Sequence, residues 1–187
     1  EGMRLLSEPL EKKNRAQARK KKRQWHPKKY ILRGNHEYRI QKAIDLDATL
    51  DGLLSYDALD TRDWDVQEFL EPLYLDGIAY AHYFYNPMTG HPYGGAAKTR
   101  LPKIGHSFTM GHQQLFDYAQ NSTRDTDTGE SKMEHGLIAG ACYLHDEDYK
   151  GPQGNDHWRG IIVKHAVQRG DYNIMTVDLN YLCMRYE

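Results

Sequence analysis

The 187-residue chain lacks the features of disulfide-stapled, secreted and membrane-spanning proteins. It has only two cysteines, Cys142 and Cys183, and no Cys-x-x-Cys pair, so a disulfide framework is excluded. The longest apolar run, residues 137–144, is far too short to cross a bilayer. The first residues show no secretory-signal pattern. We therefore expect a cytoplasmic protein with no membrane partner.

What the chain does contain fits one globular domain with an uneven charge. Hydrophobic residues make up 39% and charged residues 27% of the sequence, enough for a core at this length. Residues 1–30 hold 11 Lys/Arg and 3 Asp/Glu, a net charge of +8, whereas the remainder has a net charge of −9. We predict a single domain over residues 1–187 with a basic helical arm at residues 1–29.

The arm leads into a strand, a glycine turn and a helix. Apolar spacing and helix-favouring alanines predict a helix over residues 3–23. Residues 30–32 form a short apolar run that predicts a buried strand, and Gly34 then permits a turn before a helix over residues 38–46. This order is half of a βαβ unit, which indicates the α/β class.

The rest of the chain alternates expected strands with polar connections. Residues 57–76 are acidic, and we expect them to be irregular. Gly170 and Asp171 predict a hairpin turn. The other expected segments are strands at residues 77–84, 137–144, 160–167 and 172–177, a loop at 86–95, a short helix at 114–119 and an exposed excursion at 121–131.

The most informative motif is Gly34-Asn35-His36-Glu37, directly after the predicted strand. Ligands collect at the carboxyl ends of strands in α/β sheets. The Asn35 amide oxygen suits a hard divalent ion, and His36 could protonate a leaving oxygen. The alternative interpretation is an ordinary turn in which Asn35 caps the following helix.

Residues 30–40 (Tyr-Ile-Leu-Arg-Gly-Asn-His-Glu-Tyr-Arg-Ile) resemble the third signature of the calcineurin-like metallophosphoesterases. His82 ends an alternating strand, as the lone metal histidine of that family does, and residues 111–114 resemble its Gly-His-x-His motif. The resemblance covers residues 1–177 and is closest to phage-type members. It implies the C-terminal part of a two-sheet α/β sandwich flanked by helices.

The resemblance also implies roles for these residues. Asn35, His82 and His112 match three ligands of one metal ion, and His36 matches the catalytic histidine. The complete protein would bind two divalent ions, with Mn, Fe, Zn and Mg all compatible. They would clamp the phosphate during hydrolysis of a phosphoester, possible substrates being a nucleotide, a nucleic acid or a phosphoprotein. A phage-encoded chain would act in the host cytoplasm.

The departures from the family pattern are as informative. Neither the Asp-x-His motif nor the Gly-Asp motif has a match before Gly34, and Gln114 stands where the family has a second histidine. We therefore expect an N-terminally truncated chain with impaired activity, in which Gln114 gives weak support at most. Two alternatives remain: a non-catalytic fragment, and a nucleic-acid-binding protein that uses the basic run at residues 19–23.

Several other residues compete for a role. His91, in the Gly/Pro-rich loop, could touch substrate, and Arg39 either supports the site or pairs with a surface carboxylate. His106 competes locally with His112 as a ligand, but no predicted helix follows it. Residues 154–157 mimic the first motif and residues 145–148 form a charged run. We interpret these two segments as a surface loop and a solvated face.

Overall fold

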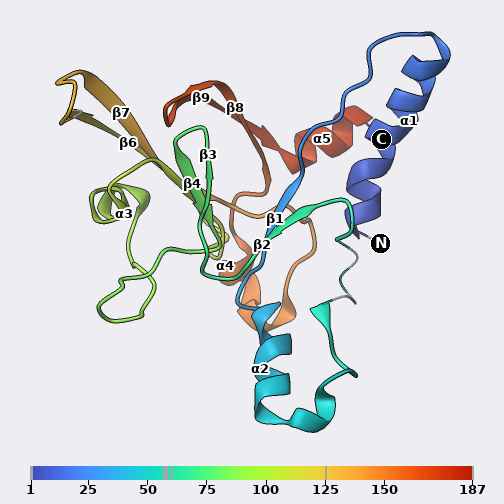
Figure 1. The fold of residues 1–187 in the computed structure, drawn as a ribbon, viewed down its shortest axis with the longest axis horizontal. Coiled ribbons are helices and arrows are strands. Elements are labelled where there is room, and N and C mark those ends of the chain that lie inside the picture. The colour runs from blue at the N-terminus through green and yellow to red at the C-terminus, as the bar shows by residue number, and fades with distance from the viewer. Residues whose placement is uncertain (1, 57–58, 60, 125, 187) are drawn as a thin grey trace. The chain divides into compact units, whose positions relative to one another are not determined.

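A computed structural model describes residues 2–56, 59, 61–124 and 126–186 (Figure 1). It has the mixed α/β class predicted from the sequence, with helices and several sheets. The chain divides into two compact units, Glu1–Phe69 (the first unit) and Leu70–Glu187 (the second unit). The single domain over residues 1–187 stays a prediction, and each unit is described by itself.

The basic arm is a helix followed by a returning segment. Helix α1 (Gly2–Arg19) ends four residues earlier than predicted. The Asn14 amide donates to the Trp25 carbonyl at 2.6 Å and accepts from the Trp25 N–H at 3.0 Å. The Lys29 Nζ donates to the Ser7 hydroxyl at 2.9 Å. These bonds hold the segment after the helix against it, so the arm is folded.

The predicted strand, turn and helix after the arm are confirmed. Strand β1 (Tyr30–Leu32) leads to helix α2 (Tyr38–Leu46) and the 3-10 turn η1 (Ala48–Leu50). Strand β1 pairs in parallel with β2 (Asp65–Gln67) in a two-stranded sheet. The residues of β1 are half-buried and not buried as expected. The prediction of an irregular segment at residues 57–76 is correct in part: short strands form at residues 65–67 and 73–75, and the other described residues are irregular. Residues 57, 58 and 60 lie outside the described residues.

The second unit is built on a five-stranded mixed sheet of order β3-β4-β5-β7-β6. The neighbours β4, β5 and β7 run parallel, and the outer strands β3 and β6 are antiparallel to them. The strands are β3 (Leu73–Leu75), β4 (Ile78–Ala81), β5 (Phe108–Met110), β6 (Phe116–Arg124) and β7 (Ser131–Ala139). The carboxyl ends of three central strands therefore lie at one edge.

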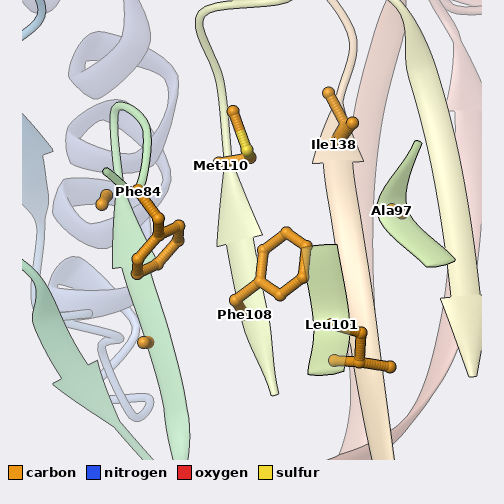
Figure 2. Close-up of a cluster of buried hydrophobic side chains, with 8 residues drawn as sticks. Phe84, Ala97, Leu101, Phe108, Met110 and Ile138 are labelled. Atoms are coloured by element: carbon orange, nitrogen blue, oxygen red, sulfur yellow. The ribbon is translucent and has the colours of Figure 1, made fainter. Parts of the chain in front are cut away.

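Helix α3 (Ala97–Ile104) packs on β6 and β7, and the core lies on that face of the sheet. Figure 2 shows labelled members of this core from α3, β5 and β7. A Cβ on Gly136 would lie 2.8 Å from the ring of Phe108, so glycine lets that ring lie against β7. The cluster comprises Ala79, Ala81, Phe84, Ala97, Leu101, Phe108, Met110 and Ile138.

A hairpin of two long strands follows, as predicted. Strands β8 (Gly160–Gln168) and β9 (Asp171–Asp178) are antiparallel. Gly170, with φ +90°, lies at their turn and donates its N–H to the Asp76 carbonyl at 2.8 Å. The remaining elements are η3 (Asp148–Lys150), α4 (Gly151–Asn155) and α5 (Leu179–Tyr186).

Two local predictions in the second unit are wrong and a third is confirmed. The expected helix at residues 114–119 lies largely in strand β6, where aromatic side chains alternate at Phe116 and Tyr118. The expected strand at residues 137–144 is β7, which starts earlier and stops at Ala139. The expected exposed excursion at residues 121–131 is confirmed for its described residues, which are all exposed except Thr123. It forms the tip of the β6–β7 hairpin, where β6 ends at Arg124 and β7 begins at Ser131 (Figure 1).

Candidate functional site

Two of the predicted metal ligands, His82 and His112, lie side by side in the second unit. His82 follows the last residue of β4, and His112 follows β5 after one glycine. Ala81 and Met110 are partners in the parallel register, so both histidines leave the same edge of the sheet. The His82 Nε2 lies 3.0 Å from the His112 Nδ1.

The loop conformation at His112 is unusual for a residue with a side chain. His112 has φ +62°, in the left-handed region, which costs on the order of 1 kcal/mol for a non-glycine residue. Its ring lies edge-on to the ring of His82 and to that of Tyr83, with centroids 5.0 Å apart in both pairs. The strained backbone thus directs the imidazole toward its partner histidine and a neighbouring tyrosine.

The histidine pair fits one divalent ion. Two nitrogen ligands at about 2.1 Å from an ion lie about 3.0–3.4 Å apart at angles near 90–110°. The 3.0 Å separation in this pair falls at the lower end of that interval. The same distance also suits a hydrogen bond between one protonated and one unprotonated ring nitrogen. Imidazole is a good ligand for Zn and Fe, whereas Mn and Mg prefer oxygen ligands.

The second unit does not complete a metal centre with carboxylates or thiols. No group of three or more His, Cys, Asp or Glu side chains suited to an ion occurs among the described residues. An asparagine ligand would not enter such a group, and Asn35 lies in the first unit. Its participation beside the pair therefore stays a prediction.

In the first unit, the Gly34 motif forms a tight turn between β1 and α2. Gly34 is buried, and its N–H donates to the Glu37 carboxylate at 2.8 Å, while its carbonyl accepts from the Tyr38 N–H at 3.1 Å. Asn35 is half-buried, and the side chain of His36 is exposed. The turn therefore presents the side chain of His36 to solvent.

The remaining support candidates are placed differently. Arg39 is exposed on α2, and His91 is exposed in the loop after β4, where its carbonyl accepts from the Asn86 N–H at 2.8 Å. Gln114 donates to the Tyr143 hydroxyl and accepts from Lys150. Because both ends of its amide are hydrogen-bonded to protein, Gln114 is a connecting residue in this structure.

The interpretation of residues 154–157 as a surface loop is wrong in part, because Gly154 and Asn155 belong to helix α4 and Asn155 is half-buried. In the charged run at residues 145–148, all side chains except that of Glu147 are exposed, as a solvated face predicts. His106 lies before β5, at the opposite strand end from His112, and burial lowers its pKa. The Asn155 amide bonds to the backbone of Glu147 in both directions, at 2.9 and 3.0 Å, and to the Gly151 carbonyl at 3.1 Å. Residues 154–157 are thus held by local hydrogen bonds at the end of α4.

Sequence reasoning missed a polar group between the main sheet and the β8–β9 hairpin. We call it the inter-sheet polar cluster; its members are Tyr80, Tyr118, His135, Lys164, Asp171 and Tyr172. His135 is 1% exposed. Its Nδ1 lies 2.6 Å from the Tyr118 hydroxyl and its Nε2 lies 2.6 Å from an Asp171 oxygen. The signal available in the sequence was a charged or ionisable residue inside each apolar strand, such as Lys164 after Ile161-Ile162-Val163.

Comparison with protein-family models, with curated proteins and with solved structures finds no match. Among the described residues, the longest helix, α1, is too polar to cross a bilayer, and no other helix is long and apolar enough.

Proposed function

We propose that the chain is related to the calcineurin-like metallophosphoesterases and serves divalent-metal-dependent phosphoester hydrolysis. The observation that carries this proposal is the 3.0 Å approach of His82 and His112 at the ends of two adjacent parallel strands. The two residues were selected for their place in a motif order, 30 positions apart. Their meeting in space is what a shared ligand requires.

In this proposal, His82 and His112 hold one ion. The role of Asn35 as a further metal ligand stays a prediction from the sequence motif. A divalent ion (Mn, Fe, Zn or Mg) would supply Lewis-acid polarisation of the phosphoryl group. His36, exposed at the turn after β1, would donate a proton to the leaving oxygen. Parallel strand ends are where α/β sheets gather such groups, and both motifs follow a parallel strand.

We further propose that this chain by itself has little or no phosphoesterase activity. The chain contains no Asp-x-His or Gly-Asp motif before Gly34, and Gln114 is bonded to Lys150 and Tyr143. A second ion therefore has no ligand set in the described residues. Substrates in this proposal are phosphoesters, including nucleotides or nucleic acids. A cytoplasmic location is supported by the two free cysteines, Cys142 and Cys183.

Calorimetric titration of the full chain with Mn or Zn tests the ligand pair. We expect weak binding of one ion, and His82→Ala should lower the affinity at least about tenfold, since even residues behind the ligands are worth about 10–100-fold. The matched control is His165→Ala, because His165 is exposed on β8. Equal affinity in wild-type protein and His82→Ala would refute the site, as would tight binding of two ions per chain.

A chromogenic phosphodiester with added Mn tests the reaction. We expect slow, metal-dependent turnover that His36→Ala reduces further while leaving metal affinity in place, because His36 acts on the leaving group. Turnover independent of metal would contradict the proposal. Robust turnover that is lost in His36→Ala would show that other residues of this chain complete the centre.

A second candidate function is nucleic-acid binding by the basic arm. All five side chains of the run at residues 19–23 are exposed, and the Asn14–Trp25 bonds hold the segment after α1 in place. A fixed, exposed row of cations suits a phosphate backbone. Binding that weakens steeply with salt would support this candidate.

A further inference from the structure

A cavity of about 580 Å³ lies in the second unit between the main sheet and the β8–β9 hairpin. Much of its wall is apolar or backbone, with Leu137, Ala139 and Ile162 among the lining side chains. A single basic group, Lys164, enters this lining, beside Tyr80 and Thr109. An amine in an apolar cavity is a chemically distinctive combination, because a lysine in a protein is ordinarily exposed.

The amine of Lys164 is held by neutral groups. Its Nζ donates to the Tyr80 hydroxyl at 3.1 Å and also to the Thr109 hydroxyl. It lies 4.3 Å from the centroid of the Tyr80 ring and 4.8 Å from that of Tyr172. Among the described residues, no carboxylate forms an ion pair with Lys164. Its position is therefore fixed without a counter-charge.

Burial lowers the pKa of Lys164 from 10.5 to about 7. The facing groups add no negative charge at neutral pH, because burial raises the pKa of Tyr80 and of Tyr172. The nearest carboxylate of the cluster, Asp171, is bonded to His135. The two tyrosine rings favour the ammonium form, but desolvation dominates. A substantial fraction of the amine is thus neutral at pH 7.

We propose that Lys164 is a covalent capture site for small apolar aldehydes, which enter the cavity and form an imine with its Nζ. The amine nitrogen attacks the carbonyl carbon, and a proton passes from nitrogen to the carbonyl oxygen, giving a carbinolamine. Loss of the hydroxyl group, which takes up a proton, and of the remaining N–H proton leaves the imine and one water. The Tyr80 hydroxyl, 3.1 Å from Nζ, is placed to relay these protons.

The apolar wall selects the substrate class. A short alkyl chain would bury against Leu137 and Ile162, whereas a carboxylate beside the aldehyde would lose its hydration without gaining a cationic partner once Lys164 becomes the imine. The proposed site uses neither His82 nor His112. The aldehyde-capture proposal can therefore be tested independently of the proposal of phosphoester hydrolysis.

Reductive trapping on the intact chain tests this proposal. The protein is treated at pH 7 with butyraldehyde and cyanoborohydride, and alkylated positions are mapped by mass spectrometry. A model lysine of pKa about 10.4 is neutral in roughly one molecule in 2,500 at pH 7. Allowing for the lower nucleophilicity of a less basic amine, we expect Lys164 to react at least about tenfold faster than Lys103, an exposed lysine beside one tyrosine ring.

Two comparisons sharpen the result. Tyr80→Phe retains the ring and removes the hydroxyl, so it should slow labelling at Lys164 and leave labelling at Lys103 unchanged. Replacing butyraldehyde with glyoxylate should reduce the preference for Lys164, because the cavity wall contains no second cationic side chain to pair with a carboxylate. Labelling of Lys164 at or below the rate of Lys103 would overturn the proposal. Labelling of Lys164 only after urea unfolding would overturn it as well.

Discussion

The two units carry their candidate site residues on sheets that differ in size and in burial. In the first unit the Gly34 turn follows a two-stranded parallel sheet, and no residue of β1 or α2 is buried. In the second unit the histidine pair follows strands that carry a continuous apolar core, including Phe108 at 0% exposure. Leaving aside residues 2, 3 and 5, every buried hydrophobic side chain among the described residues belongs to the second unit.

This difference separates sites that are fixed by packing from sites that are fixed by hydrogen bonds. The position of His112 depends on β5, whose own residues Phe108 and Met110 are buried. The position of Asn35 depends on local bonds of the Gly34 turn, such as the one to Glu37. Two-stranded sheets are marginal without further apolar cover. We therefore expect the second unit to carry the measurable stability of this chain.

Removal of a core side chain should have the largest effect. Phe108→Ala deletes a fully buried ring that contacts Phe84 across the sheet face, with centroids 5.5 Å apart. We expect a loss of about 3–5 kcal/mol in the free energy of unfolding, measured by urea denaturation. Leu46→Ala in the first unit is the control, because Leu46 is 89% exposed. It should change stability by less than about 0.5 kcal/mol. A larger loss for Leu46→Ala than for Phe108→Ala would reverse the comparison.

Replacing a proposed metal ligand should have the next largest effect, which is on the affinity for Zn or Mn. His112→Ala should lower Zn or Mn affinity at least about tenfold, because it removes a ligand of the pair. Asn35→Ala changes the other unit, so a comparable loss in this variant would indicate that both units contribute to one ion. Unchanged affinity in Asn35→Ala would confine the ion to His82 and His112. Calorimetry measures both variants, and circular dichroism checks that each remains folded.

Local features of the sequence were predictable, and pairings between distant segments were not. Residues 30–46 gave a correct strand, turn and helix because each signal lies within a few positions. Gly170 likewise marked the β8–β9 turn. Helix α3 was missed because Ala96 offers no capping side chain and Pro102 lies inside the helix, although Gly105 marks its end.

In the candidate site, too, local motifs were predictable and contacts between distant segments were not. His82 and His112 were selected by motif order, but their 3.0 Å contact depends on the parallel pairing of β4 with β5, which no local pattern specifies. The inter-sheet polar cluster was invisible for the same reason. His135 and Asp171 are 36 positions apart and meet only because β9 packs against β7. Such contacts require the tertiary fold.

The buried amine predicts a pH dependence of stability. Because the pKa of Lys164 falls from 10.5 to about 7 on folding, the unfolded chain holds a proton that the folded chain releases between these values. The free energy of unfolding should therefore rise with pH from 7 to about 9.5, and the destabilisation is fully present below pH 7. Above pH 10 the raised pKa values of Tyr80 and Tyr172 act in the opposite direction.

Lys164→Met should flatten this rise, because it removes the titrating amine and keeps most of the volume. Lys103→Met is the matched control and should retain the dependence of the wild-type protein, since Lys103 is exposed on α3. Urea denaturation at pH 7, 8 and 9 measures the effect. An identical rise in Lys164→Met and wild-type protein would show that another group titrates.

The smallest expected effect is on the salt dependence of nucleic-acid binding. It compares a lysine of the arm in the first unit with an exposed lysine in the second unit. If the run at residues 19–23 contacts phosphates of a duplex, the logarithm of affinity should fall with the logarithm of salt concentration with a slope of up to about −4.5. Lys22→Ala should reduce the magnitude of this slope by about one, because each phosphate contact releases its own counterion. Lys98→Ala, which removes an exposed lysine of α3, should leave the slope unchanged. Fluorescence anisotropy of a labelled duplex at several salt concentrations measures all three proteins. Equal slopes for Lys22→Ala and Lys98→Ala would assign the binding to the overall charge of the chain and not to the arm.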